Sequence, residues 1–97
     1  GLYRLKALEP YADDAGFRAD FMDVKRKNKE ALSGLIQKMT RIAVNPESLF
    51  DVQIKRIHEY KRQLLNIMHI IHQYFSIVED GKDLSVPRTY IFAGKAA

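Results

Sequence analysis

The fold of this chain is decided by the stretch Ser48-Leu-Phe-Asp-Val-Gln-Ile-Lys-Arg-Ile-His-Glu-Tyr-Lys-Arg-Gln-Leu-Leu-Asn66. Its residues 50–54 alternate apolar and polar side chains, which is the period of a β-strand with one buried face. From about His58 the apolar spacing becomes helical, with neighbouring turns carrying Tyr60, Leu64, Leu65 and Met68. The pattern therefore predicts a strand that leads directly into a helix.

Four cations stand at the junction between this strand and this helix, namely Lys55, Arg56, Lys61 and Arg62. The carboxyl end of a parallel strand is the edge where open α/β sheets bind ligands, and a helix N-terminus adds N–H groups there. Such a junction favours anions, and phosphate above all. The sequence has no Gly-rich phosphate loop, so binding would depend on side-chain charge. A solvated basic surface explains the same residues without any ligand.

The first half of the chain predicts two helices. Leu2, Leu5 and Leu8 indicate a short helix that Pro10 ends or kinks. Asp13 and Asp14 offer an N-cap and an acidic start for a longer helix, which we expect to end near residues 40–42. Its apolar side chains follow one face: Phe17, Phe21, Val24, Leu32, Leu35 and Met39.

The second half predicts strand, helix and strand, over residues 49–55, 58–79 and 86–93. This helix is apolar around most of its girth, which is typical of a helix buried on several sides or pressed against a sheet and a neighbour. A turn follows around Gly81, and Pro87 is expected near the first position of the last strand. The order predicts an α/β fold with a parallel βαβ unit, incomplete as a stand-alone fold because parallel sheets are covered on both faces.

Composition narrows the class of protein. The chain has 97 residues, 46% apolar and 29% charged, with a net charge of +4, which is ordinary for a globular domain. The absence of cysteine excludes disulfides and thiolate metal sites. His69 and His72 can share a helix face, but no acidic ligand stands beside them, so we expect no metal site. No apolar run is long enough for a membrane span, and no signal peptide is evident, so we expect a cytoplasmic protein.

Besides phosphate binding, two classes of function fit the basic cluster and the apolar helix. A small basic domain could bind nucleic acid through the four cations, with an affinity that falls steeply with salt, although the chain lacks a known reader motif. A helical interaction module could use residues 67–78 as its partner surface. A module of either kind should be monomeric and sharply folded, whereas a piece of a larger enzyme should be sticky or oligomeric.

The stretch over residues 48–66 resembles the corresponding run of the α-glucan phosphorylases, the glycogen, starch and maltodextrin phosphorylase family. The resemblance extends to Asn45-Pro46 before it and to Val86-Pro-Arg-Thr-Tyr-Ile-Phe-Ala-Gly-Lys-Ala-Ala97 after it, so it covers essentially the whole chain. It implies a pyridoxal phosphate enzyme that splits a terminal α-1,4-glucosidic bond with inorganic phosphate and releases glucose 1-phosphate. The parent enzyme is then expected to be a cytoplasmic homodimer that binds an α-1,4-glucan and phosphate, and neither nucleic acid nor membrane.

The resemblance also implies a place for the chain in the parent fold. Residues 1–47 would be a helical lead-in. Residues 48–97 would be the first βαβ unit of the C-terminal, nucleotide-fold-like domain, whose sheet is Rossmann-like and of the glycosyltransferase-B type.

Carried over residue by residue, the resemblance implies that Lys55, Arg56 and Lys61 hold the phosphates of the cofactor and of the substrate. Tyr60 would touch a hydroxyl of the glucosyl ring, with His58 and Glu59 nearby and residues 96–97 in the adjoining loop. The lysine that forms the Schiff base with pyridoxal lies downstream in the family, and Lys95 matches a different place. We therefore expect the isolated chain to be inactive and to bind neither cofactor nor glucan tightly.

Overall fold

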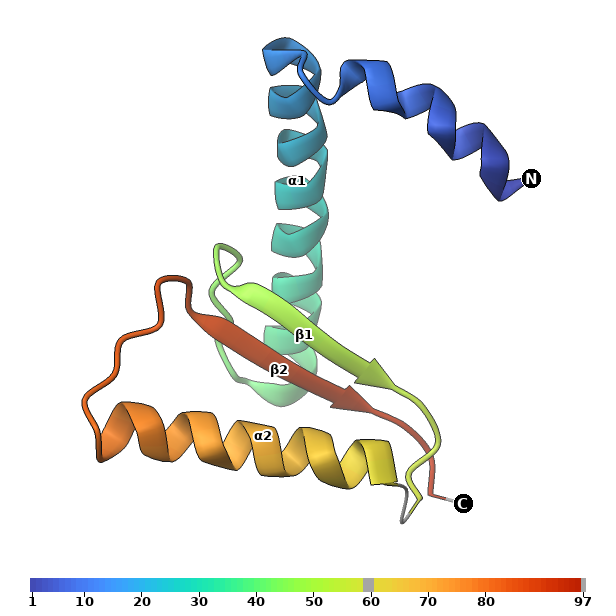
Figure 1. Ribbon diagram of the computed structural model, residues 1–97. Coiled ribbons are helices and arrows are strands. Elements are labelled where there is room, and N and C mark those ends of the chain that lie inside the picture. Colours follow the sequence, from blue (N-terminus) through green and yellow to red (C-terminus); the bar gives the residue numbers. More distant parts are fainter. Residues whose placement is uncertain (59–60, 97) are drawn as a thin grey trace. The chain divides into compact units, whose positions relative to one another are not determined.

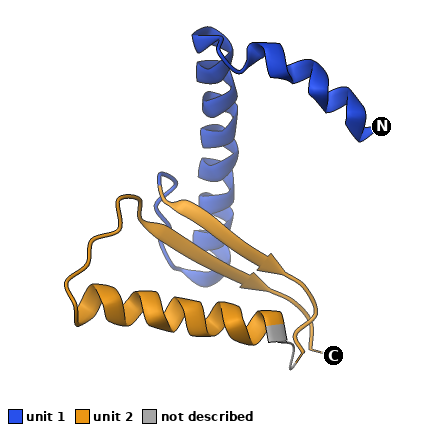
Figure 2. Ribbon diagram, viewed as in Figure 1, with its two compact units in different colours: residues 1–47 blue, residues 48–97 orange. Residues whose placement is uncertain are grey.

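The computed structural model describes residues 1–58 and 61–96, with the Lys61 side chain excepted. The chain forms two compact units, Gly1–Glu47 and Ser48–Ala97 (Figure 2). The first contains a 3₁₀ helix, η1, and a long α-helix, α1. The second contains two strands and a helix in the order β1, α2, β2 (Figure 1).

Helix η1 spans Leu2–Tyr11 and contains Pro10. The sequence predicts that Pro10 ends or kinks this helix, and the helix ends one residue beyond it. A proline removes one N–H donor, but its fixed φ fits a helical backbone, so neighbouring bonds can carry the chain past it. Here the N–H of Ala12 donates to the carbonyl of Glu9 at 3.1 Å, which closes the last turn beyond the proline.

Helix α1 spans Ala15–Thr40, and its N-cap and its end agree with the sequence-based prediction. The Asp14 carboxylate accepts a hydrogen bond from the Phe17 N–H at 3.0 Å and so satisfies one open donor of the first turn. At the other end Arg41 adopts a left-handed conformation with φ 62°, and its N–H donates to the carbonyl of Gln37 at 2.8 Å. Glycine is the usual residue in this conformation, so the side chain of Arg41 makes the cap more costly than usual.

Strands β1, Leu49–Ile54, and β2, Arg88–Ala93, pair in parallel, and helix α2, Lys61–Val78, connects them. The predicted α/β class and the parallel βαβ unit are confirmed. Pro87 precedes β2, to which it contributes only a carbonyl that accepts from the Leu49 N–H at 2.7 Å. A residue without an N–H donor suits this position at the edge of the ladder. The turn after α2 contains Gly81 at φ 66°, a conformation that favours glycine.

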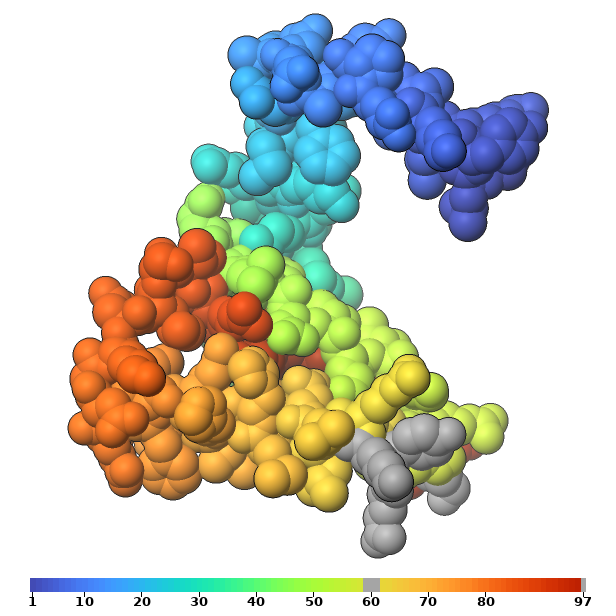
Figure 3. Space-filling view, viewed as in Figure 1, coloured from blue at the N-terminus to red at the C-terminus, as the bar shows by residue number. Residues whose placement is uncertain are grey.

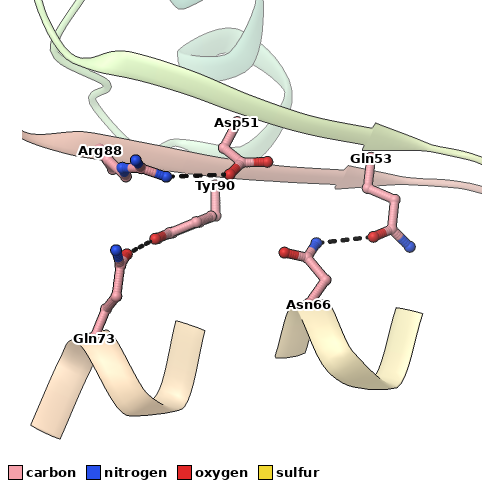
Figure 4. Close-up of polar contacts among 6 residues, drawn as sticks. All are labelled: Asp51, Gln53, Asn66, Gln73, Arg88 and Tyr90. Carbon is pink, nitrogen blue, oxygen red and sulfur yellow. Dashed lines mark hydrogen bonds and ion pairs between the residues drawn. The ribbon is translucent and has the colours of Figure 1, made fainter. Parts of the chain in front are cut away.

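Helix α2 turns a mostly polar stripe toward the sheet. Asn66 donates to the side chain of Gln53 at 2.8 Å, and the hydroxyl of Tyr90 donates to the side chain of Gln73 (Figure 4). The least exposed positions of the described helix share this stripe: Gln63, Asn66, Ile70, Gln73 and Ser76. Most of the apolar girth of α2 is exposed in this structure. The sheet residues opposite this stripe include the polar Gln53 and Tyr90 (Figure 4), and the apolar Phe92 lines a hollow with Gln63 and Ile67.

Apolar side chains stay at the surface of both units. Among the residues that the structure describes, no apolar side chain is buried, and on α2 Leu64 is 59% and Leu65 62% exposed. Figure 3 shows α2, coloured yellow to orange, open along one side. Exposed apolar area on this scale marks surfaces that larger proteins cover with further structure. None of the described helices is both long and apolar enough to cross a membrane.

Candidate anion site at the carboxyl edge of the sheet

Parallel pairing brings the ends of β1 and β2 to one edge. The N–H of Lys55 donates to the carbonyl of Ala93 at 3.1 Å, and the N–H of Ile57 donates to that of Lys95 at 3.0 Å. An isolated parallel bridge joins Ile57 and Ala96, so the two segments that follow β1 and β2 stay paired beyond the strands. We call residues 55–58 and 94–96 the carboxyl edge. Helix α2 begins beside it (Figure 1).

Gly94 allows these two backbone segments to approach each other closely. A Cβ atom at this position would lie 2.1 Å from the carbonyl oxygen of Lys55, far inside any van der Waals contact. Only glycine fits such an approach of two backbones without displacing one of them. Gly94 thereby helps to set where the main chain of Lys55 runs.

Gln63, in the first turn of α2, holds the other side of the same loop. Its side-chain Nε2 donates to the carbonyl of Arg56 at 2.8 Å, and its Oε1 accepts from the N–H of His58 at 3.0 Å. The Gln63 side chain is enclosed, with the residue only 9% exposed. One side-chain amide therefore binds two main-chain groups of the strand-to-helix connection.

Two of the predicted cations border one hollow beside this edge. Lys55 and Arg62 line a hollow of about 430 Å³ together with Gln53 and Gln63. The side chains of Arg56 and His58 are exposed on the loop between them. Fixed cations beside a hollow favour an anionic group such as a phosphate, and Arg56 adds a planar fork that can bind two oxygens at once.

Part of the predicted site lies outside the described residues. Glu59, Tyr60 and residue 97 are in this group, as is the side chain of Lys61, whose main chain begins α2. His69 and His72 lie on exposed positions further along α2. No cluster of three or more potential metal-ligating side chains occurs within residues 1–58 and 61–96.

Sequence reasoning did not single out Gln63, which binds the carboxyl edge, or Gly94, which lies in it. Gln63 lies between a cation and two leucines in the run that predicts the helix, where a polar residue is expected to face water. Gly94 follows a strand, where a glycine usually means a turn. A signal was available for each: a glutamine in the first helical turn after a strand, and a glycine just past the register of a parallel partner.

Comparison with known proteins decides the family. The family model described as Carbohydrate phosphorylase matches residues 1–97, which is the whole chain. This chain belongs to the carbohydrate phosphorylase family.

Its relatives in this family include glycogen phosphorylases of bacteria and animals. The chain is 56% identical over 96 residues to glycogen phosphorylase of Synechocystis sp., covering 99% of this chain and 11% of that protein. It is 47% identical to glycogen phosphorylase of Chlamydia trachomatis, covering 99% of this chain and 12% of the relative. The muscle form of Ovis aries is also 47% identical, with 99% and 11% covered. The chain thus spans about a tenth of the length of these phosphorylases, and its resemblance to the family, predicted from residues 48–66, is confirmed.

Proposed function

We propose that this chain is part of an α-glucan phosphorylase, which transfers a terminal α-1,4-linked glucosyl unit to inorganic phosphate and releases glucose 1-phosphate. The observation that carries the proposal is the family match over the whole chain, with relatives named glycogen phosphorylase. The cations at the carboxyl edge support it, because a reaction of this kind needs a place that holds phosphate.

Within this proposal the carboxyl edge holds phosphate oxygens. Arg56 binds the substrate phosphate through two oxygens, and Lys55 and Lys61 act as point charges. Two phosphates close together repel each other strongly, at about 4 kcal/mol per unit-charge pair at 4 Å near a protein surface. Several fixed cations offset that repulsion. Tyr60 and His58 would contact the glucosyl unit beside them.

The cofactor proposed for the parent enzyme is pyridoxal phosphate. The hollow lined by Lys55 and Arg62 fits the phosphate group of such a cofactor, because its cationic donors match phosphate oxygens. When bound, the cofactor would supply a phosphate that exchanges a proton with the substrate phosphate. The residues of this chain would orient that phosphate and neutralise its charge.

The proposal also places the chain in the parent fold. Residues 1–47 are the helical lead-in, and residues 48–97 are the first βαβ unit of the C-terminal domain, whose Rossmann-like sheet is of the glycosyltransferase-B type. The parallel pair β1 and β2 supports this, since such a sheet grows by adding parallel strands at its edges. The parent enzyme would be a cytoplasmic homodimer.

The test is phosphorolysis by the intact parent protein. We expect glucose 1-phosphate to be released from a linear α-1,4-glucan in excess phosphate, and the rate to fall by about a hundredfold or more in Arg56→Ala and in Lys61→Ala, since each removes a charge that stabilises phosphate. Lys82→Ala is the matched control, because Lys82 lies in the turn after α2, away from the carboxyl edge.

Each outcome separates one part of the proposal. An active wild type with unaffected variants would reject the assignment of Arg56 and Lys61 as phosphate ligands. A folded, cofactor-loaded wild type without activity would reject the proposed reaction.

A further inference from the structure

The main chain of the strand-to-helix connection has two sides, and each is bound by a different partner. On one side the N–H of Lys55 donates to the carbonyl of Ala93 at the end of β2, at 3.1 Å, and the N–H of Ile57 donates to that of Lys95 just beyond β2, at 3.0 Å. On the other side lie the carbonyl of Arg56 and the N–H of His58. Both of these are taken by the side-chain amide of Gln63, at 2.8 and 3.0 Å.

This pattern is that of a parallel strand. In a parallel ladder one residue of a neighbouring strand donates to residue i−1 and accepts from residue i+1 of the strand beside it. Gln63 does the same to Arg56 and His58, with Ile57 between them. A side-chain amide is suited to this role because it carries one acceptor oxygen and an NH₂ donor in a single plane, like a peptide group.

From this geometry we propose that Gln63 is a positioning residue for phosphate recognition. By replacing a strand on the open side of the connection, it holds the backbone of Arg56 and His58 extended, so that the neighbouring cations lie at the carboxyl edge. The inference deepens the proposed function and rests on it. Gln63 itself contacts main chain and needs no contact with phosphate.

Burial makes this arrangement stiff. Gln63 is 9% exposed, so water competes little for its two hydrogen bonds, whereas the loop that it holds is exposed. A binding constellation must be held within about 0.5 Å of its productive geometry by supporting residues of this kind. Loss of the two Gln63 hydrogen bonds should therefore lower the affinity for phosphate, beyond any loss of thermal stability.

The test uses the intact parent protein and the variant Gln63→Met, which keeps the length of the side chain but neither hydrogen bond. We expect the affinity for inorganic phosphate, measured by titration calorimetry, and the KM for phosphate to worsen by about tenfold to a hundredfold. The KM for the glucan should worsen by less, because Gln63 binds the main chain of His58 and not the side chain proposed to contact the glucosyl unit.

Gln73→Met is the matched control. It removes a side-chain amide hydrogen bond between the same helix and the sheet, the contact with the Tyr90 hydroxyl, and neither residue lines the hollow. We expect both variants to lose thermal stability to a similar extent and only Gln63→Met to lose phosphate affinity. If Gln63→Met does not fold, Gln63→Asn serves instead, since its shorter amide cannot reach both main-chain groups and adds no charge to the hollow.

The outcomes distinguish this inference from the proposed function. Unchanged phosphate affinity in a folded Gln63 variant, or an equal loss in Gln73→Met, would overturn the positioning role. A third outcome is that phosphate affinity falls only in the Gln63 variant, while the wild-type parent protein releases no glucose 1-phosphate. That outcome would support the positioning role and reject the proposed reaction.

Discussion

At the scale of single residues, the carboxyl edge depends on two positions that carry no charge. Gln63 binds the loop from one side, and Gly94 lets the β2 extension approach it from the other. The cations supply the chemistry of the site, but these two residues set the path of the backbone that bears Lys55 and Arg56. Because both residues act on the path of the backbone, their substitution should lower the affinity for phosphate as well as the stability of the fold.

We expect Gly94→Ala in the parent protein to lower the free energy of unfolding by about 1–3 kcal/mol and to weaken phosphate binding, because the added Cβ would meet the Lys55 carbonyl oxygen. Thermal unfolding and phosphate titration measure the two effects. Gly34→Ala in α1 is the matched control. Its Cβ would meet no atom of the described residues within 4 Å, apart from its own helix backbone, so a change of at most about 1 kcal/mol in favour of alanine is expected. A Gly94→Ala protein as stable as wild type would contradict the close approach.

At the scale of elements, helix termini follow local chemistry while helix faces do not. The Asp14 cap of α1 involves residues three apart and is readable from sequence. The face that α2 turns to the sheet is set by partners such as Gln53, 13 positions away from Asn66. Because α2 is apolar around most of its girth, its sequence does not predict which face meets the sheet. The amide contacts of Asn66 and Gln73 show which face does.

The cap can be tested in a peptide of residues 11–42. We expect Asp14→Ala to lower its helix content, since the cap contributes about 0.5–2 kcal/mol. Circular dichroism at 222 nm, a wavelength that reports helix content, measures the change. Asp13→Ala is the control, because Asp13 precedes the N-cap residue and should have a smaller effect. Equal losses from the two substitutions would show that charge near the helix start matters and that the hydrogen bond to Phe17 does not.

At the scale of the whole molecule, the chain exposes more apolar surface than a stable monomer tolerates. Among the described residues no apolar side chain is buried, and exposed ones lie on every helix and on both strands. Two parallel strands and one covering helix give too little enclosed area to offset the conformational entropy of folding. The chain also spans only about a tenth of its relatives, which leaves ample structure elsewhere in a parent protein to cover these surfaces.

The isolated 97-residue chain is therefore expected to self-associate and to unfold without a sharp transition. Light scattering coupled to size-exclusion chromatography and scanning calorimetry measure these two properties. It should also bind no stoichiometric amount of pyridoxal phosphate. A monomer with a cooperative transition, or salt-resistant binding of one cofactor per chain, would contradict this expectation.

Sequence alone determined the elements of this protein, the parallel βαβ order, the cap of α1 and the family, because each depends on residues close together in the chain or on their order. It also located Lys55 and Arg56 at the end of a strand. Only the tertiary structure decided which stripe of α2 meets the sheet, that Gln63 completes the main-chain pairing of Arg56 and His58, and that Gly94 lies against Lys55. Gly94 and Lys55 are far apart in the chain. The periodicity of a sequence predicts helices and strands, but it does not specify atomic positions as accurately as a close backbone contact or a hydrogen bond requires.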